Sequence, residues 1–105
     1  MREYKIGELT TATGFTAAKE RAKQVWYTLS QASFAQNGDA GCCTLGGGLY
    51  MYIIDKGCRK AKRKHIMSSP SGYQGEIPKY AGMEEAAEIM REAGFECQTS
   101  YGNMD

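Results

Sequence analysis

Six lysine and arginine side chains fall within the nine positions from Lys56 to Lys64, although the whole chain has only thirteen. The formal net charge is +1, so the remainder of the chain is acidic by comparison. Like charges placed this close together repel each other, and folding does not require them. Cationic side chains at this density can hold the phosphates of a nucleic acid or nucleotide, or contact an acidic protein surface. The segment is therefore the first candidate for a binding site.

The basic segment is expected to form the second strand of a β-hairpin. Residues 49–54 have apolar side chains on both faces of an alternating pattern, which predicts a strand. The following Asp55-Lys56-Gly57 is a turn of the hairpin type. The run from Cys58 to Met67 would then be the antiparallel partner. Because its charges fall on both faces, this strand should lie at a sheet edge or project as an arm.

The predicted binding surface combines the hairpin with aromatic side chains. Tyr50, Tyr52 and Tyr73 are expected within reach of the basic strand, where their rings could stack on bases. The alternative is that the lysines only protect a sheet edge from aggregation. The candidate residues for contact with a partner or with phosphate are Lys56, Arg59, Lys60, Lys62, Arg63, Lys64, His65, Tyr50, Tyr52 and Tyr73.

The residues that could do covalent chemistry are few. His65 is the only histidine, so a Cys–His pair would require it to lie beside one of the four cysteines, Cys42, Cys43, Cys58 and Cys97. The glycine-rich stretch 38–48 follows a predicted helix and precedes a strand, which is the wrong order for a P-loop or a dinucleotide site. A loop, or the start of a bulged strand, explains it better. We therefore predict a protein that is not an enzyme and that needs no cofactor.

The cysteines and the hydropathy pattern indicate in which cellular environment the protein is expected. No Cys-x2-4-Cys or His-x3-5-His pair, the usual spacing of zinc ligands, occurs in the chain. Residues 1–6 lack the apolar core of a secretion signal, and the longest apolar run, 49–54, is far shorter than the ~20 residues of a membrane span. We expect a cytoplasmic protein without membrane contact, whose cysteines stay free and mostly pack as small buried hydrophobes.

The order of the expected elements predicts a single α+β domain over residues 1–105, with a mainly antiparallel sheet of three to five strands and two helices packed on one face. After a Thr16 N-cap, apolar positions recur at helical spacing at Ala22, Val25, Trp26, Leu29, Ala32 and Ser33. The second helix has its apolar stripe at Met83, Ala86, Ala87 and Met90, and Gly94 suits a left-handed C-cap. The expected elements are a strand at 4–6, a turn at 10–14, a helix at 16–35, the hairpin at 49–67, a short strand at 76–80, a helix at 82–93 and a strand at 95–101.

Three short segments resemble those of small bacteriophage and prophage proteins: G-D-A-G-C-C-T-L-G at 38–46, G-Y-Q-G at 72–75 and Y-G-N-M-D at 101–105. None of them is a motif with assigned chemistry. The resemblance implies a counter-defence protein in the cytoplasm of a bacterial host, of the type of the anti-CRISPR inhibitors. Its partner would be a bacterial defence protein or ribonucleoprotein.

The resemblance and the charge pattern leave several functions open. Many anti-CRISPR proteins are acidic DNA mimics, whereas this chain would have to apply its basic hairpin to an acidic protein patch or to guide RNA. A second function is a homo-oligomeric sponge that sequesters a cyclic nucleotide or another phosphorylated immune signal. A third is a small accessory protein that binds nucleic acid.

Overall fold

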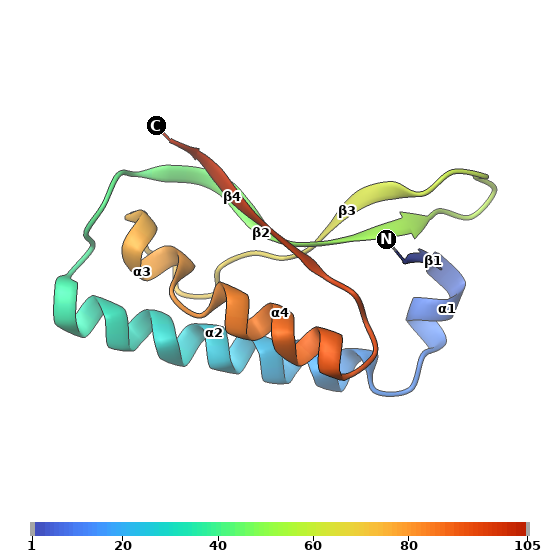
Figure 1. The fold of residues 1–105 in the computed structure, drawn as a ribbon, viewed down its shortest axis with the longest axis horizontal. Coiled ribbons are helices and arrows are strands. Elements are labelled where there is room, and N and C mark those ends of the chain that lie inside the picture. Colours follow the sequence, from blue (N-terminus) through green and yellow to red (C-terminus); the bar gives the residue numbers. More distant parts are fainter. Residues whose placement is uncertain (1, 105) are drawn as a thin grey trace.

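The computed structural model describes residues 2–104, apart from the side chains at positions 10, 11, 44, 45, 103 and 104. Within this part of the chain one four-stranded sheet lies over a layer of helices, so the predicted α+β class is confirmed (Figure 1). The elements in chain order are β1 (Glu3–Lys5), α1 (Ile6–Thr11), α2 (Phe15–Asn37), β2 (Thr44–Ile54), β3 (Lys62–Met67), α3 (Glu76–Tyr80), α4 (Met83–Glu92) and β4 (Gln98–Met104).

The sheet is built around β2, which pairs with every other described strand. Its C-terminal half pairs with β1 in parallel, from Glu3↔Tyr52 to Lys5↔Ile54, and with β3 in antiparallel orientation. Its N-terminal half pairs with β4 in antiparallel orientation as far as Tyr50↔Gln98. Since β3 also pairs at Tyr50, β3 and β4 must lie on opposite edges of β2. The same argument at Tyr52 places β1 on the edge that β4 occupies.

The core lies between one face of β2 and the two longer helices. Every second side chain of β2 points into the core, namely Leu49, Met51 and Ile53. Trp26 of α2 belongs to the same core and is fully buried. Burial of such a side chain stabilises the fold by about 1.5–3 kcal/mol. Trp26 Nε1 also donates to the Lys79 carbonyl at 2.9 Å, which satisfies its one polar group. The remaining buried apolar side chains are Tyr4, Leu9, Ala18, Ala22, Met67, Met83, Ala86, Ala87, Met90, Phe95 and Cys97.

The two predicted helices are confirmed, but α2 begins at Phe15 after Gly14, so the predicted Thr16 N-cap is wrong, and α2 runs on to Asn37. Its buried face also differs from the prediction. The buried residues of α2 are Ala18, Ala22, Trp26 and Ser30, a narrow row at i, i+4 spacing, whereas Leu29 is 37% exposed and Ala32 is exposed. The row is narrow because α4 begins very close to α2. A Cβ on Gly82 would lie 2.9 Å from the Trp26 Cα. The predicted stripe of α4 is correct, and Gly94 has the expected positive φ.

Three of the expected local structures are wrong. The short strand predicted at 76–80 is the helix α3, because Pro78 falls in the first helical turn, where its missing N–H is not needed. Ile6, predicted as the end of a strand, begins the helix α1, which also takes in the start of the predicted threonine turn. The final strand extends to Met104, beyond the predicted end at 101.

The glycine run in β2 admits a tyrosine hydroxyl between two strands. Gly46, Gly47 and Gly48 belong to β2 and have φ of 76°, 82° and 138°, so the predicted start of a strand with positive φ is confirmed. The register shift that the structure shows comes later, between Leu49 and Tyr50. The Tyr80 hydroxyl donates to the Gly46 carbonyl at 3.3 Å and accepts from the Gly102 N–H at 2.6 Å. The hydroxyl thereby takes the place of a direct backbone hydrogen bond between β2 and β4. A Cβ at Gly47 would lie 2.8 Å from the Tyr80 hydroxyl oxygen.

Replacement of Gly48 by alanine should cost far more stability than the same change at Gly46. A Cβ at Gly46 meets open space, so Gly46→Ala costs only the positive-φ strain of roughly 1–2 kcal/mol. A Cβ at Gly48 would collide with the Met67 carbonyl oxygen and press on His65, which adds roughly 1–3 kcal/mol. Urea unfolding of the two variants measures both losses. Equal losses would contradict the proposed close packing of β2 against β3.

The expectation that the cysteines are mostly buried is wrong for three of them. All four are free thiols, but Cys42, Cys43 and Cys58 are exposed and only Cys97 lies in the core. The first two fall in the connection between α2 and β2, and Cys58 follows the hairpin turn. Burial raises the pKa of the Cys97 thiol to about 12, an effect that the nearby positive charges of Arg91 and Lys19 only partly offset.

Cys97 should resist thiol reagents as long as the protein is folded. The thiolate is the reactive species, and a pKa of about 12 leaves almost none of it at pH 8. Timed alkylation followed by mass spectrometry should show three rapid additions and a fourth that appears only in denaturant. Rapid fourfold labelling under native conditions would show that Cys97 is not held in the core.

Candidate functional site

One face of the sheet is left uncovered and carries aromatic and cationic side chains. Every described helix lies on the other face (Figure 1). Because Met51 and Ile53 point into the core, the alternating residues Tyr50 and Tyr52 point outward. The register places His65 opposite Tyr50 and Arg63 opposite Tyr52, and opposite residues share a face. We call Tyr50, Tyr52, Arg63 and His65 the open-face cluster.

The two tyrosines of the cluster have different surroundings. The guanidinium carbon of Arg63 lies 4.1 Å from the centroid of the Tyr50 ring, within the range of a cation–π contact. The His65 ring meets Tyr50 edge-on, with 5.2 Å between centroids. Tyr52 is half-buried and has no such ring contact with another described residue. Arg63 and His65 therefore hold the Tyr50 ring in place, whereas the Tyr52 ring has no comparable contact among the described residues.

The predicted partner strand is shorter than expected. The turn is confirmed, since Cys58 N–H donates to the Asp55 carbonyl at 3.0 Å and Gly57 has φ of 82°. The strand itself begins at Lys62, because β2 ends at Ile54 and leaves residues 58–61 without a strand to pair with. Residues 55–61 are a loop, and the expectation of a strand from Cys58 is wrong over its first part.

The loop carries half of the basic cluster, namely Lys56, Arg59 and Lys60, and all three are exposed. Neither these three nor Lys62 form an ion pair with any residue that the structure describes. Lys64 does: its Nζ lies 2.8 Å from Asp55 Oδ2, in a pair exposed enough to contribute little to stability. The positive charge of the loop is therefore not neutralised locally.

Lys62 and Lys64 lie on the other face of β3. They are opposite Ile53 and Met51, whose side chains point toward the helices. The ten predicted site residues are thus divided between the open face, the loop, the helix-side face of β3 and, for Tyr73, a more distant position.

Tyr73 does not join the surface near the hairpin. Its ring stacks on Phe34 with 4.3 Å between centroids, and its hydroxyl donates to Gln31 Oε1 at 2.9 Å. Both partners belong to the C-terminal part of α2, which ends at the opposite end of the molecule from the loop 55–61 (Figure 1). The expected proximity of Tyr73 to the basic strand is wrong, because the chain after β3 crosses back to α2.

His65 has a serine rather than a cysteine as its hydrogen-bond partner. Its Nε2 lies 3.0 Å from Ser68 Oγ, a pair that the sequence analysis did not consider. Among the described residues no carboxylate contacts His65, so the third group that orients a catalytic histidine is not shown. The described part of the chain also contains no group of three or more His, Cys, Asp or Glu side chains placed to hold a metal ion.

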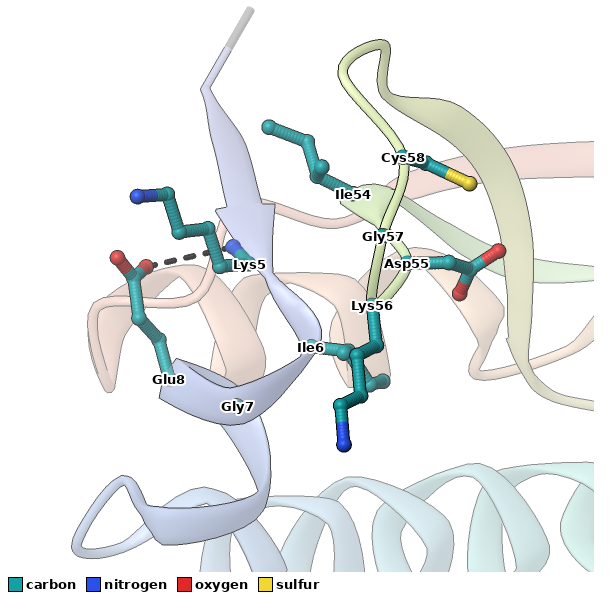
Figure 2. A pocket seen from close by; sticks show the side chains of 9 residues that line it. All are labelled: Lys5, Ile6, Gly7, Glu8, Ile54, Asp55, Lys56, Gly57 and Cys58. Carbon is teal, nitrogen blue, oxygen red and sulfur yellow. Dashed lines mark hydrogen bonds between the residues drawn. The ribbon is translucent and has the colours of Figure 1, made fainter.

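A cavity of 380 Å³ lies at the turn end of the hairpin, between the β1–α1 junction and the start of the loop 55–61 (Figure 2). Ile54, the next outward position of β2 after Tyr52, lines it together with Ile6. Lys5 and Lys56 are also among its lining residues, and the Lys5 N–H donates to Glu8 Oε2 at 3.4 Å. The cavity thus continues the row formed by Tyr50 and Tyr52 and has room for one planar or apolar group.

Comparison of the chain with protein-family models, with curated proteins and with solved structures finds no significant match. The resemblance to phage proteins therefore stays a prediction. Among the helices that the structure describes, none combines the length and the apolar character needed to cross a membrane.

Proposed function

We propose that the protein is a non-enzymatic binding protein that holds single-stranded nucleic acid on the open face of its sheet. The observation that supports this most strongly is the pair Tyr50 and Tyr52, side by side on an uncovered face and bordered by Arg63 and His65. Aromatic rings in a cationic setting are the usual platform for unpaired bases.

The spacing of the two tyrosines suits successive bases. They are two residues apart on one strand, which is about 6.6–6.8 Å. A base that stacks on each ring contributes about 1–3 kcal/mol, with little dependence on its identity. The bases of a duplex are already stacked and cannot reach the rings, so the platform favours a single strand over a duplex.

The loop 55–61 supplies the charge that the platform needs. Lys56, Arg59 and Lys60 are exposed and form no ion pair with another described residue. Lys56 also lines the cavity together with Ile54, the position after Tyr52 in the outward row. Phosphates of a strand that runs along β2 would meet these side chains and release their counterions. With a formal net charge of +1, the attraction is local to the loop rather than a property of the whole surface.

In the setting that the phage resemblance implies, the single strand is the guide RNA of a bacterial defence ribonucleoprotein. The protein then acts as an anti-CRISPR-like inhibitor through its basic hairpin. This form of the proposal needs no acidic, DNA-like surface on the inhibitor. The two functions also differ in their ligand. The inhibitor binds a nucleic-acid strand, whereas the sponge binds a small cyclic nucleotide.

Loss of either outward tyrosine should weaken binding of a single strand. Tyr50→Ala and Tyr52→Ala should each raise the Kd for a fluorescein-labelled oligonucleotide by about 5- to 150-fold, the equivalent of about 1–3 kcal/mol. Fluorescence anisotropy measures the change. Tyr27→Ala is the matched control, since Tyr27 is 43% exposed and lies on α2. Unchanged affinity in both test variants, or tighter binding of duplex, would contradict the proposal.

Removal of the loop charges should lower affinity and flatten its salt dependence. In the triple variant Lys56→Gln, Arg59→Gln, Lys60→Gln, the slope of log K against log salt should fall in magnitude by about 2, since each phosphate contact with a single strand contributes about 0.7. Titrations at several salt concentrations give the slope.

A variant with the same loss of charge on α2, Lys19→Gln, Arg21→Gln, Lys23→Gln, is the control and should keep the wild-type slope. In a second measurement, wild type should bind a guide-loaded Cas effector but not the same effector without guide, and the loop variant should bind the guide-loaded form more weakly than wild type. Equal slopes for the two triple variants would remove the loop from the site. Equal binding to both forms of the effector would contradict the assignment to guide RNA.

A further inference from the structure

β4 is an edge strand that lacks the usual protection. Among the strands that the structure describes, it pairs only with β2. Residues 98–104 are Q-T-S-Y-G-N-M, without a charged residue or a proline. Exposed edges normally carry such residues, because an unprotected edge pairs with other strands. The opposite edge of the same sheet does carry them, with Lys62, Arg63 and Lys64 on β3.

An exposed aromatic side chain lies at the middle of this strand. Tyr101 is 60% exposed, more than any other large apolar side chain that the structure describes. Its ring meets Tyr80 edge-on with 5.0 Å between centroids, and Tyr80 is itself fixed by its hydrogen bonds to Gly46 and Gly102. Tyr101 is thus supported from one side, on the face that the helices occupy, and open on the other.

We propose that β4 pairs with β4 of a second copy of this chain, in antiparallel orientation and around a two-fold axis at Tyr101. In this register position 98 lies opposite 104, position 99 opposite 103, and Ser100 opposite Gly102. Each Tyr101 meets its own copy, and the four rings of Tyr80 and Tyr101 form one row across the axis. The outer N–H and C=O groups of both strands gain partners.

A second copy fits this edge better than it fits β3. A two-fold contact brings identical surfaces together, so each surface must be self-complementary. Self-pairing of β3 would place lysines and arginines of two copies side by side, which like-charge repulsion disfavours. Self-pairing of β4 opposes no charged side chain of the strand itself and covers an aromatic ring on each copy.

The dimer has a continuous sheet with the strand order β3-β2-β4-β4-β2-β3. Because the two-fold axis of an antiparallel pair is perpendicular to the sheet, the helices of both copies lie on the same face. The two open-face clusters then share the other face. The dimer does not depend on nucleic-acid binding and forms without any ligand.

Analytical ultracentrifugation of the protein alone, over a range of concentrations, tests the proposal. Wild type should sediment as a dimer that dissociates on dilution. Tyr101→Lys places two cations opposite each other at the axis and should give a monomer at every concentration. Tyr27→Lys, the same change at an exposed tyrosine of α2, should remain dimeric. Thermal unfolding confirms that both variants are folded.

Hydrogen exchange gives a second, local readout. Amides of β4 should be protected in wild type and should lose that protection in Tyr101→Lys, whereas amides of α2 exchange equally in both. A wild-type protein that is monomeric overturns the proposal. This holds also if β4 of that monomer becomes protected when a peptide from another protein is added, because the partner of the edge would then not be a second copy. A Tyr101→Lys variant that stays dimeric overturns it as well, since the contact would then lie elsewhere.

Discussion

The alternation of side chains along β2 is the constraint on which the rest of the structure depends. β2 pairs with each of the other described strands, so the direction of its side chains sets the faces of the whole sheet. Leu49, Met51 and Ile53 are committed to the core by their burial. Tyr50 and Tyr52 must therefore point outward, and a shift of one residue would exchange the two sets. The core and the candidate site are two consequences of one register.

The glycine run lies in the part of β2 that pairs with β4. That pairing runs from Thr44 to Tyr50 around the inserted Tyr80 hydroxyl, while β3 pairs from Leu49 onward and β1 from Tyr52 onward. Side chains at Gly47 and Gly48 would block these approaches. A strand with ordinary residues there would pair more regularly, but it could not take in the α3 tyrosine. The three glycines thus connect the helix layer to the sheet at a point where the ladder is interrupted.

Local patterns were sufficient for the parts of the fold that depend on periodicity. The apolar stripe of α4 follows from spacing alone. Alternation places Tyr50 and Tyr52 on the same face of the strand, but both faces of residues 49–54 are apolar, so the burial seen in the structure was needed to show which face points outward. Contacts between distant segments were not accessible in this way. Tyr73 follows the basic strand in sequence, yet it packs on Phe34 of α2 because the intervening chain reverses direction. The segment 76–80 was predicted as a short strand, whereas it is the helix α3, with Pro78 in the first helical turn.

The two explanations of the basic cluster, edge protection and binding, differ in where the charges should lie. Edge protection accounts for Lys62, Arg63 and Lys64, which are on β3. It does not account for Lys56, Arg59 and Lys60, which lie in a loop that has no strand edge to protect. The loop charges are better explained by a ligand with negative charge, and its bases can lie on the tyrosine row beside them.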